Sequence, residues 1–202
     1  MLLSRAHVLS DKWGGIPVVL AGDFNSTPDS AMYEFLSTSE LNITAHDKRY
    51  ISGQDRLQFS LYSLPRLLKC SWTSEELKNA SGNPKCTLLK HPLELRSSYA
   101  SVKGNVQTRC PYGEPVATTY HLKFVGTVDY LWYSTGLVPT RVLDTLPMAT
   151  LKATGGLPSK EIGSDHLALV SEFMFAECRE KHPQNPTEIT VTEEREDNLI
   201  QS

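Results

Sequence analysis

An acid and an amide stand two residues apart directly after an apolar run, in Gly22-Asp23-Phe24-Asn25. On an extended backbone, side chains two residues apart point to the same side. A carboxylate and a carboxamide in that arrangement could hold a water nucleophile and donate a hydrogen bond to a phosphoryl oxygen. The structural alternative is an Asx turn that caps the next helix. These four residues alone leave both readings open.

A second acid, Asp129, interrupts an apolar and aromatic stretch that runs from Phe124 to Ser134. A carboxylate among such neighbours is costly unless it is paired or hydrogen-bonded. A histidine or a metal partner would supply the reason. The alternative is a residue of an edge strand that faces solvent.

A third polar pair, Asp165-His166, stands at the start of the last apolar segment. Imidazole exchanges its proton near neutral pH, and an adjacent carboxylate could address a metal-bound phosphate from the same loop. The alternative is that Ser164-Asp165-His166 forms only a turn. Each of the three signals is weak when it is taken alone.

A helix, a strand and a second helix must position the first pair. Apolar residues at helical spacing predict a helix over residues 2–12, and the apolar run over residues 16–21 is typical of a buried central strand. Ser26 or Thr27 is expected to cap the second helix, which should end near Ser39. The acid and the amide therefore lie in a loop between a strand and a helix.

The middle of the chain, residues 40–112, is rich in turns and lacks sustained periodicity. Its clearest signal is the capping-box spacing of Thr73 and Glu76, which predicts a short helix over residues 74–80, closed by Gly82. No core-sized set of apolar residues accompanies this region. It is therefore interpreted as a surface excursion and not as a second domain.

Order returns in the last third, where three segments rich in Val, Thr, Tyr and Trp predict an antiparallel meander over residues 115–121, 124–134 and 137–145. A last strand is expected over residues 167–175. Early alternation of helix and strand followed by antiparallel strands suggests one domain over residues 1–176, with a mixed sheet covered by helices. The polar, charged residues 177–202 are predicted to be a disordered tail.

Composition excludes several classes of function. The net charge of -3 argues against strong non-specific binding of nucleic-acid backbone, which depends on clustered Lys and Arg. No apolar run approaches the roughly 18 residues of a membrane span, so no membrane partner is expected. The four cysteines lack metal-site spacing and are read as free thiols in a reducing compartment, cytoplasmic and/or nuclear.

The three polar motifs, in this order and at these distances, resemble the second half of the endonuclease/exonuclease/phosphatase superfamily. Further segments resemble its carbon catabolite repressor 4 type of deadenylase, and most of all the plant homologues without leucine-rich repeats. These segments are Asn25-Ser26-Thr27-Pro28, Trp72 to Leu77, Glu114 to His121, Leu143 to Pro147 and Gly155 to Ser159. The resemblance covers residues 1–175 and implies an α/β fold, as the C-terminal half of a two-sheet α/β sandwich.

The resemblance also implies a role for each polar residue. Asp23 would be the general base or would orient the attacking water, and Asn25 would hold a phosphate oxygen. Asp129 would orient the imidazole of His166, which would contact and stabilise the phosphoryl group. Asp165 would lie at the metal side of the scissile phosphate, with Mg²⁺ as the implied cofactor.

An aromatic residue matches the family position that stacks on adenine. Phe124 lies five residues before Asp129, and stacking contributes about 1–3 kcal/mol per base with little sequence preference. The alternative is a core aromatic of the meander. The implied partners are poly(A) RNA and the subunits of a deadenylase complex.

The family pattern begins before Gly22, and its principal magnesium-binding glutamate would lie before Met1. Mg²⁺ needs one or two carboxylates and otherwise keeps its waters. The chain is thus expected to be the C-terminal portion of such a domain, and a truncated, inactive form is one reading of it. The main hypothesis is a magnesium-dependent 3′–5′ exoribonuclease that shortens poly(A) tails and releases AMP. The alternatives are a nocturnin-like phosphatase of adenosine dinucleotides and a non-catalytic interaction module.

Overall fold

The structure is a computed structural model that describes residues 2–54 and 71–176. The predicted disordered tail over residues 177–202 lies outside the described residues. No helix among the described residues is long and apolar enough to cross a membrane. Cys86 and Cys110 are free thiols, as expected, and the other two cysteines fall outside the described ranges.

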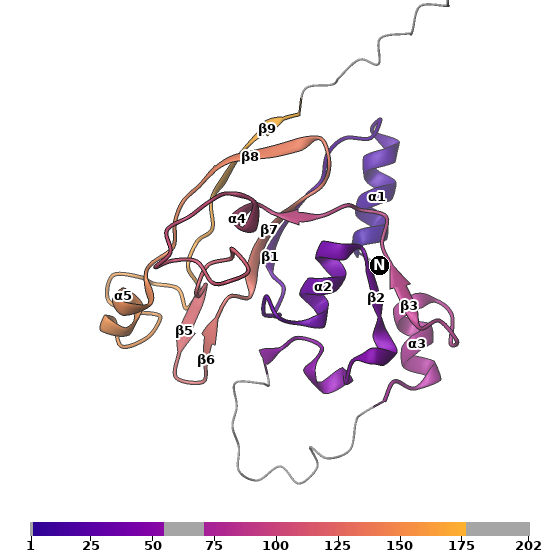
Figure 1. Cartoon of the computed structure of the whole chain (residues 1–202), viewed down its shortest axis with the longest axis horizontal. Helices are drawn as coiled ribbons and strands as arrows, with labels where there is room; N and C mark the ends of the chain where they lie inside the picture. The colour runs from indigo at the N-terminus through magenta and orange to yellow at the C-terminus, as the bar shows by residue number, and fades with distance from the viewer. Residues whose placement is uncertain (1, 55–70, 177–202) are drawn as a thin grey trace, which may run out of the picture.

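A three-stranded antiparallel sheet lies at the centre, with β1 (Val19–Asp23), β7 (Asp129–Tyr133) and β4 (Arg96–Ser97) in the order β1-β7-β4. Successive side chains of a strand point to opposite faces. Tyr130 and Trp132 of β7 therefore share one face, and both are almost completely buried. The sheet is the platform on which the other elements pack (Figure 1).

Two helices cover that buried face. Helix α1 (Leu2–Lys12) contributes Leu3 and Ala6, and α2 (Ala31–Thr38) contributes Met32, Tyr33 and Leu36. The predicted helix over residues 2–12 is confirmed. The cap of α2 was predicted wrongly: Ser30 and not Ser26 or Thr27 accepts the hydrogen bond from Tyr33 N. The hydroxyls of Ser26 and Thr27 are engaged within the preceding loop, by Phe24 O and Asp29 Oδ1.

Strand β1 is not the buried central strand that was expected. Within the described residues it pairs with β7 alone, at the edge of the sheet, and Val19 is 44% exposed. Every described strand pairing is antiparallel, so the expected mixed sheet is not seen there either. The reason is that Val18 and Leu20 face the core, whereas no described element covers the opposite face of β1.

The middle of the chain forms short elements: β2 (Glu40–Asn42), two 3₁₀ turns (Ile43–Ala45 and Lys48–Tyr50), α3 (Ser74–Ser81), β3 (Leu88–Lys90) and α4 (Ser98–Ser101). Strands β2 and β3 pair with each other. Helix α3 carries the predicted capping box between Thr73 and Glu76 and ends at Gly82, in the left-handed conformation. That prediction is confirmed.

The predicted meander is wrong, because the segment from Phe124 to Ser134 is two strands and not one. Strand β6 (Phe124–Gly126) pairs with β5 (Thr119–His121), whereas β7 pairs with β1 and β4. Between them, the backbone N–H groups of Val128 and Asp129 donate to the hydroxyl of Thr118 (3.1 and 3.2 Å). The chain therefore leaves one sheet and enters the next without losing its hydrogen bonds.

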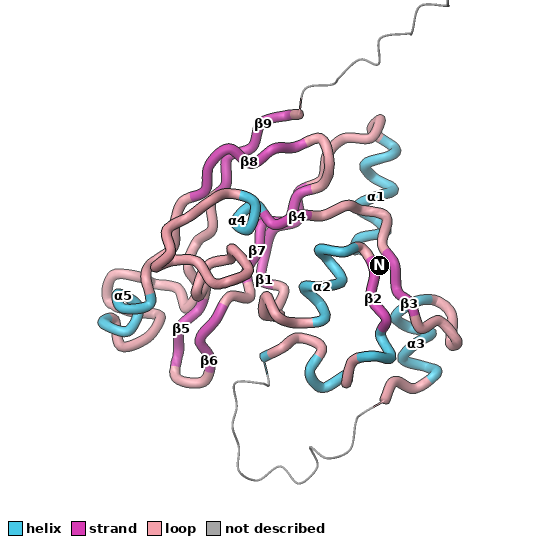
Figure 2. The backbone as a smooth tube through the Cα atoms, viewed as in Figure 1, coloured by secondary structure: helices cyan, strands magenta, loops and turns pink. Residues whose placement is uncertain are grey.

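The last elements close the other side of the molecule. Strand β8 (Leu137–Val142) pairs with β9 (Ser171–Phe175), and α5 (Met148–Ala153) packs near the β5–β6 hairpin (Figures 1 and 2). The last strand starts at Ser171, later than the predicted 167. A second apolar cluster joins α5 to the hairpin through the buried residues Ala117, Leu151 and Leu157. This cluster packs the β5–β6 hairpin against the loop before β9, through Tyr120, Val125 and Leu167.

Candidate active site

The pairing of β1 with β7 brings the first two predicted acids together. Asp23 and Asp129 are Cα partners at the end of this ladder. One more backbone hydrogen bond, from Phe24 N to Val128 O (2.8 Å), continues the pairing past both acids. Because side chains alternate along a strand, a slip of one residue would turn one acid to the other face of the sheet. The register of two strands far apart in sequence therefore builds this end of the site.

Asp23 and Asn25 are linked to each other in a tight turn, and the backbone between them is not extended as predicted. Asn25 has a left-handed backbone with φ 49°. Asp23 Oδ1 accepts from Asn25 N (2.7 Å), and Asp23 Oδ2 accepts from Asn25 Nδ2 (3.1 Å). The Asx turn of the structural reading is thus present, and it orients the amide itself. One N–H of Asn25 Nδ2 remains to donate elsewhere.

Gln54 holds Asn25 from the other side. Its Nε2 donates to Asn25 O (2.7 Å) and lies 3.4 Å from Asn25 Oδ1. The segment that carries Gln54 is fixed by the bond from Thr27 N to Ser52 O (2.8 Å). It also needs a glycine at position 53, where φ is 75° and a Cβ atom would lie 2.0 Å from Thr27 Oγ1.

Asp129 and His166 form a hydrogen-bonded pair, with His166 Nδ1 2.8 Å from Asp129 Oδ2. The same oxygen accepts from the hydroxyl of Thr118 at 2.6 Å. Because the lone pairs of Thr118 accept from Val128 N and Asp129 N, its proton must point to Asp129. Asp129 Oδ2 is therefore an acceptor for both partners. Nδ1 of His166 carries the proton, which leaves Nε2 as the free atom of the ring.

The loop before β9 delivers His166 to this place. Leu167 N donates to Thr118 O (2.7 Å), and the hydroxyl of Thr119 donates to Asp165 O (2.7 Å). His166 and Thr119 also form an isolated antiparallel bridge. The neighbouring residues Thr118 and Thr119 thus hold Asp129 and the loop that carries His166.

The pKa of His166 is raised above its ordinary value. Burial alone would lower this pKa, but the hydrogen bond and the charge of Asp129 raise it, as do the charges of Asp23 and Asp165. The protonated imidazolium is therefore stabilised on the side of the site where three carboxylates gather. A cation there suits the binding of a phosphoryl group.

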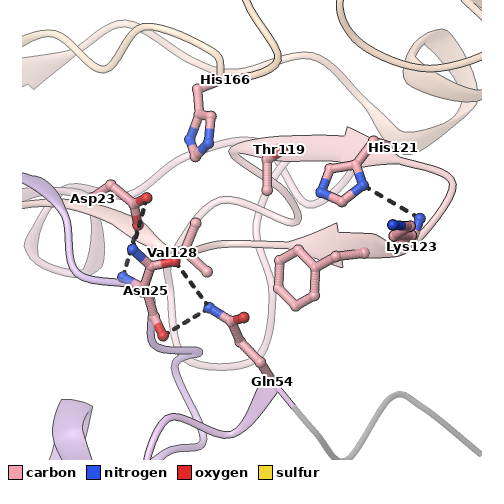
Figure 3. Close-up of a pocket in the computed structure, with 9 residues that line it drawn as sticks. Asp23, Asn25, Gln54, Thr119, His121, Lys123, Val128 and His166 are labelled. Atoms are coloured by element: carbon pink, nitrogen blue, oxygen red, sulfur yellow. Dashed lines mark hydrogen bonds between the residues drawn. The ribbon is translucent and has the colours of Figure 1, made fainter.

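These residues face a cavity of about 220 Å³. Asp23 and Asn25 lie on one side of it, and His121 and Lys123 of the β5–β6 hairpin lie on the other (Figure 3). Phe124 also lines the cavity, and its ring lies against Gly126, where a Cβ atom would meet the ring at 3.1 Å. The predicted aromatic residue therefore lines the same cavity as Asp23, Asn25 and His166. It is not a core residue of a meander.

Comparison with known proteins agrees with this geometry. The Endonuclease/Exonuclease/phosphatase family profile matches residues 2–166. The chain belongs to that family. Its fold is the α/β fold of this family, and the fold predicted from the sequence is confirmed.

Among curated relatives of the family, Carbon catabolite repressor protein 4 homolog 3 of Arabidopsis thaliana is 56% identical over 183 residues, which cover 86% of this chain and 41% of that protein. Homolog 5 of the same plant is 46% identical, covering 87% of this chain and 41% of that protein. The CCR4-Not complex 3′-5′-exoribonuclease subunit Ccr4 of Coccidioides immitis is 30% identical, covering 82% of this chain and 17% of that protein. The chain spans less than half the length of these relatives.

A solved structure of the family also superposes on the chain. It is the crystal structure of ANGEL2, a 2′,3′-cyclic phosphatase, in complex with adenosine-2′,3′-vanadate, with a TM-score of 0.63 and 31% sequence identity. The match covers 86% of this chain and 49% of that chain. At this identity the likeness supports the family assignment as well as the fold.

The described residues supply carboxylates for a family metal ion but no cluster of three or more metal-binding side chains. Both oxygens of Asp23 accept from Asn25, and Asp129 Oδ2 accepts from Thr118 and His166. Asp165 is exposed, and among the described residues Thr119 donates to its backbone oxygen and no residue donates a hydrogen bond to its carboxylate. Its carboxylate would hold a hydrated Mg²⁺, which needs as few as one carboxylate from the protein.

The sequence interpretation found Asp23, Asn25, Phe124, Asp129 and His166. The structure brings four of them to one cavity, and Asp129 lies behind it, hydrogen-bonded to His166. Their roles stay predictions. Thr118, Gln54, His121 and Lys123 were missed as site residues. Alternation along β5 was a usable signal for Thr119 and His121, because every second residue of a strand shares a face. No local pattern indicated Thr118 or Gln54, because both act through hydrogen bonds to residues far along the chain.

Proposed function

We propose that the chain carries the phosphate-handling side of a phosphodiesterase site that acts on the 3′ end of adenosine-rich RNA, with poly(A) as substrate and AMP as product. The observation that carries the proposal is the Asp129–His166 pair at 2.8 Å beside Asp23, with His166, Asp23, Asn25 and Phe124 lining one cavity. The names of the plant and fungal relatives support it at the level of the family.

In the proposed reaction, Asp23 accepts a proton from water while the water oxygen attacks the phosphorus of the terminal phosphodiester. The bond from phosphorus to the 3′ oxygen of the preceding nucleotide breaks, and that oxygen takes a proton from a solvent water to become a hydroxyl, while Asp23 returns its proton to solvent. Asn25 Nδ2 and a protonated His166 Nε2 donate to the phosphoryl oxygens as negative charge grows there. Phe124 stacks on the adenine.

Magnesium dependence is part of the proposal. A bound Mg²⁺ would neutralise the phosphate and stabilise charge on the leaving oxygen, and Asp165 is the described residue that would hold it. The subunits of a CCR4-Not type complex are the proposed partners, in view of the name of the fungal relative. Cytoplasmic and/or nuclear localisation stays a prediction.

The test is to incubate the purified chain with 5′-labelled oligo(A) and Mg²⁺, beside an Asp23→Ala control. We expect stepwise shortening and release of AMP by the parent chain only, with EDTA abolishing the reaction. If no shortening occurs at high protein concentration and the chain is folded by circular dichroism, independent exonuclease activity is wrong.

A 2′,3′-cyclic phosphatase is the second candidate, because ANGEL2 is named as such and is 31% identical to this chain over the matched region. Adenosine 2′,3′-cyclic phosphate separates the two candidates, since its hydrolysis opens a ring and shortens no strand. Release of a monophosphate from this substrate without any shortening of oligo(A) would favour the phosphatase.

A further inference from the structure

The β5–β6 hairpin presents a second group of polar side chains to the cavity. His121 pairs with Phe124 across the turn, and Leu122 at the tip is fully exposed, with a relative exposure of 103%. On the opposite face of the hairpin, Tyr120 and Val125 pack into the apolar cluster around Leu151. The alternation of the strands therefore turns Thr119, His121 and Phe124 toward the cavity on a supported platform.

The ring of His121 offers a donor to the cavity. Its Nδ1 accepts a hydrogen bond from Lys123 N (3.3 Å). In the neutral ring the proton is then on Nε2. His166 has the opposite tautomer, since its Nδ1 carries a proton toward Asp129. The cavity thus has two histidines with different capacities: Nε2 of His121 is an N–H donor in the neutral ring, and Nε2 of His166 donates when its ring is protonated.

Lys123 is the one lysine or arginine among the described residues that line the cavity. It is exposed, and no described carboxylate forms an ion pair with it. Asp23 lies on the other side of the cavity (Figure 3), and Asp129 is its Cα partner in the β1–β7 ladder. A single phosphate held by Asn25 and His166 leaves this cation without a partner, whereas a strand with a further phosphate gives it one.

We propose that His121 and Lys123 form a subsite for a non-reacting phosphate next to the scissile one, so that the site prefers an RNA strand to a single nucleotide. This inference rests on the proposed function, because it names the part of the site that recognises the strand. Two donors, one of them the ammonium of a lysine, match the oxygens of a phosphodiester.

The experiment measures binding of a short fluorescein-labelled oligo(A) by anisotropy in EDTA, so that the probe is not cleaved, over a series of salt concentrations. We expect Lys123→Gln to weaken binding roughly fivefold, as one exposed phosphate contact is lost. The slope of log Kd against log salt concentration should fall by about 0.7, the value for one contact with a single strand. His121→Ala should weaken binding with a smaller change in slope.

Lys85→Gln is the matched control, because it removes the same charge from an exposed lysine that lies beyond α3 and away from the cavity. Leu122→Ser controls for the hairpin itself, since that side chain is fully exposed at the tip. Both controls should keep the affinity and the salt slope of the parent chain.

Two further outcomes separate the subsite from the proposed function. If Lys123→Gln and Lys85→Gln change affinity and slope equally while the parent chain binds oligo(A), the subsite is wrong and the function stands. If the parent chain binds oligo(A) no better than AMP, the strand substrate itself is wrong. Loss of the preference for oligo(A) over AMP in Lys123→Gln supports the subsite.

Discussion

Thr118 shows how one buried hydroxyl can organise a site without lining its cavity. It has no exposed surface, accepts from two backbone N–H groups and donates to Asp129 Oδ2 at 2.6 Å. Its proton has a single possible direction, so the carboxylate is held in one orientation. The orientation of the His166 ring then follows from the same oxygen.

Removal of that hydroxyl should reduce activity. Thr118→Val keeps the shape but leaves Asp129 free to rotate, and a small misplacement of reacting groups costs up to about 100-fold in rate. We expect kcat for oligo(A) shortening to fall by about 10-fold to 100-fold, and Thr118→Ser to restore most of it. The proton signals of the His166 ring should also shift in an NMR spectrum.

Thr127→Val is the control for that experiment. Thr127 is equally buried at 2% exposure, and its hydroxyl donates to Pro115 O (2.6 Å) and does not touch Asp129. Equal losses of activity in the two variants, with equal losses of stability, would mean that Thr118 acts through folding alone.

Glu114 should make stability depend on pH. Burial raises the pKa of this carboxyl, against the lowering effect of its hydrogen bonds, one of them from the Tyr33 hydroxyl (2.8 Å), and of the charge of Arg109. An acid whose folded pKa is raised stabilises the protein at pH values below its unfolded pKa, about 4.3. That contribution is lost as pH rises through the folded pKa.

The free energy of unfolding of the parent chain, measured by urea titration at several pH values, should therefore fall as pH rises from about 4.3 to the folded pKa of Glu114. Glu114→Gln should remove the fall, because the amide does not ionise. Glu94→Gln, at an exposed position, should retain it. A parent chain whose free energy of unfolding rises steadily over this pH range would contradict this account of Glu114.

At the scale of elements, the capping box of α3 offers a direct test of local stability. Thr73 Oγ1 accepts from Glu76 N (3.2 Å), and Glu76 Oε2 accepts from Thr73 N (2.8 Å). Thr73→Ala should lower the free energy of unfolding by about 1 kcal/mol, measured by urea denaturation. Thr73→Ser, which keeps the oxygen, should stay within experimental error of the parent.

Sequence patterns predicted those elements whose signals are local. The helix periodicity of α1, the capping box of α3 and the strand end that carries Asp23 all depend on neighbouring residues. The meander was wrong because the partner of β7 lies more than a hundred residues away, and because Thr118 replaces ladder hydrogen bonds between β6 and β7. Contacts between residues so far apart along the chain produce no periodic pattern in the sequence.

The same limit applies to the site. Residues with reactive side chains at strand ends could be found by type and place, as Asp129 and His166 were. Gln54 could not, because it reaches Asn25 from 29 positions away. The left-handed backbone of Asn25 was also missed, since an asparagine after a strand is compatible with either conformation.

At the scale of the whole molecule, apolar side chains accumulate on the surface near α1 and β1. Five large ones between residues 8 and 19 are 44–66% exposed, namely Val8, Leu9, Trp13, Ile16 and Val19. Contiguous apolar surface favours association, and the free edge of β1 can pair with another strand. We expect the purified chain to self-associate as its concentration rises.

A variant with Leu9→Gln and Trp13→Gln should reduce that association, measured by sedimentation velocity, and should keep the far-UV circular dichroism of the parent. Leu122→Ser, which removes an isolated exposed leucine at the hairpin tip, should leave the association unchanged. A monomeric parent chain at high concentration would contradict the prediction.

The β5–β6 hairpin also has a consequence for how the family can diversify. Its base is buried, because Thr118 and Val128 are 0% and 2% exposed, whereas its tip at Leu122 lies in solvent. Substitutions at the base should disturb the Asp129–His166 pair. Substitutions near the tip should change only the contacts with substrate groups beyond the reacting phosphate. One short hairpin thus separates the side chains that orient the reacting groups from those that meet the strand beyond them, so the tip can be changed to bind a different substrate without moving the Asp129–His166 pair.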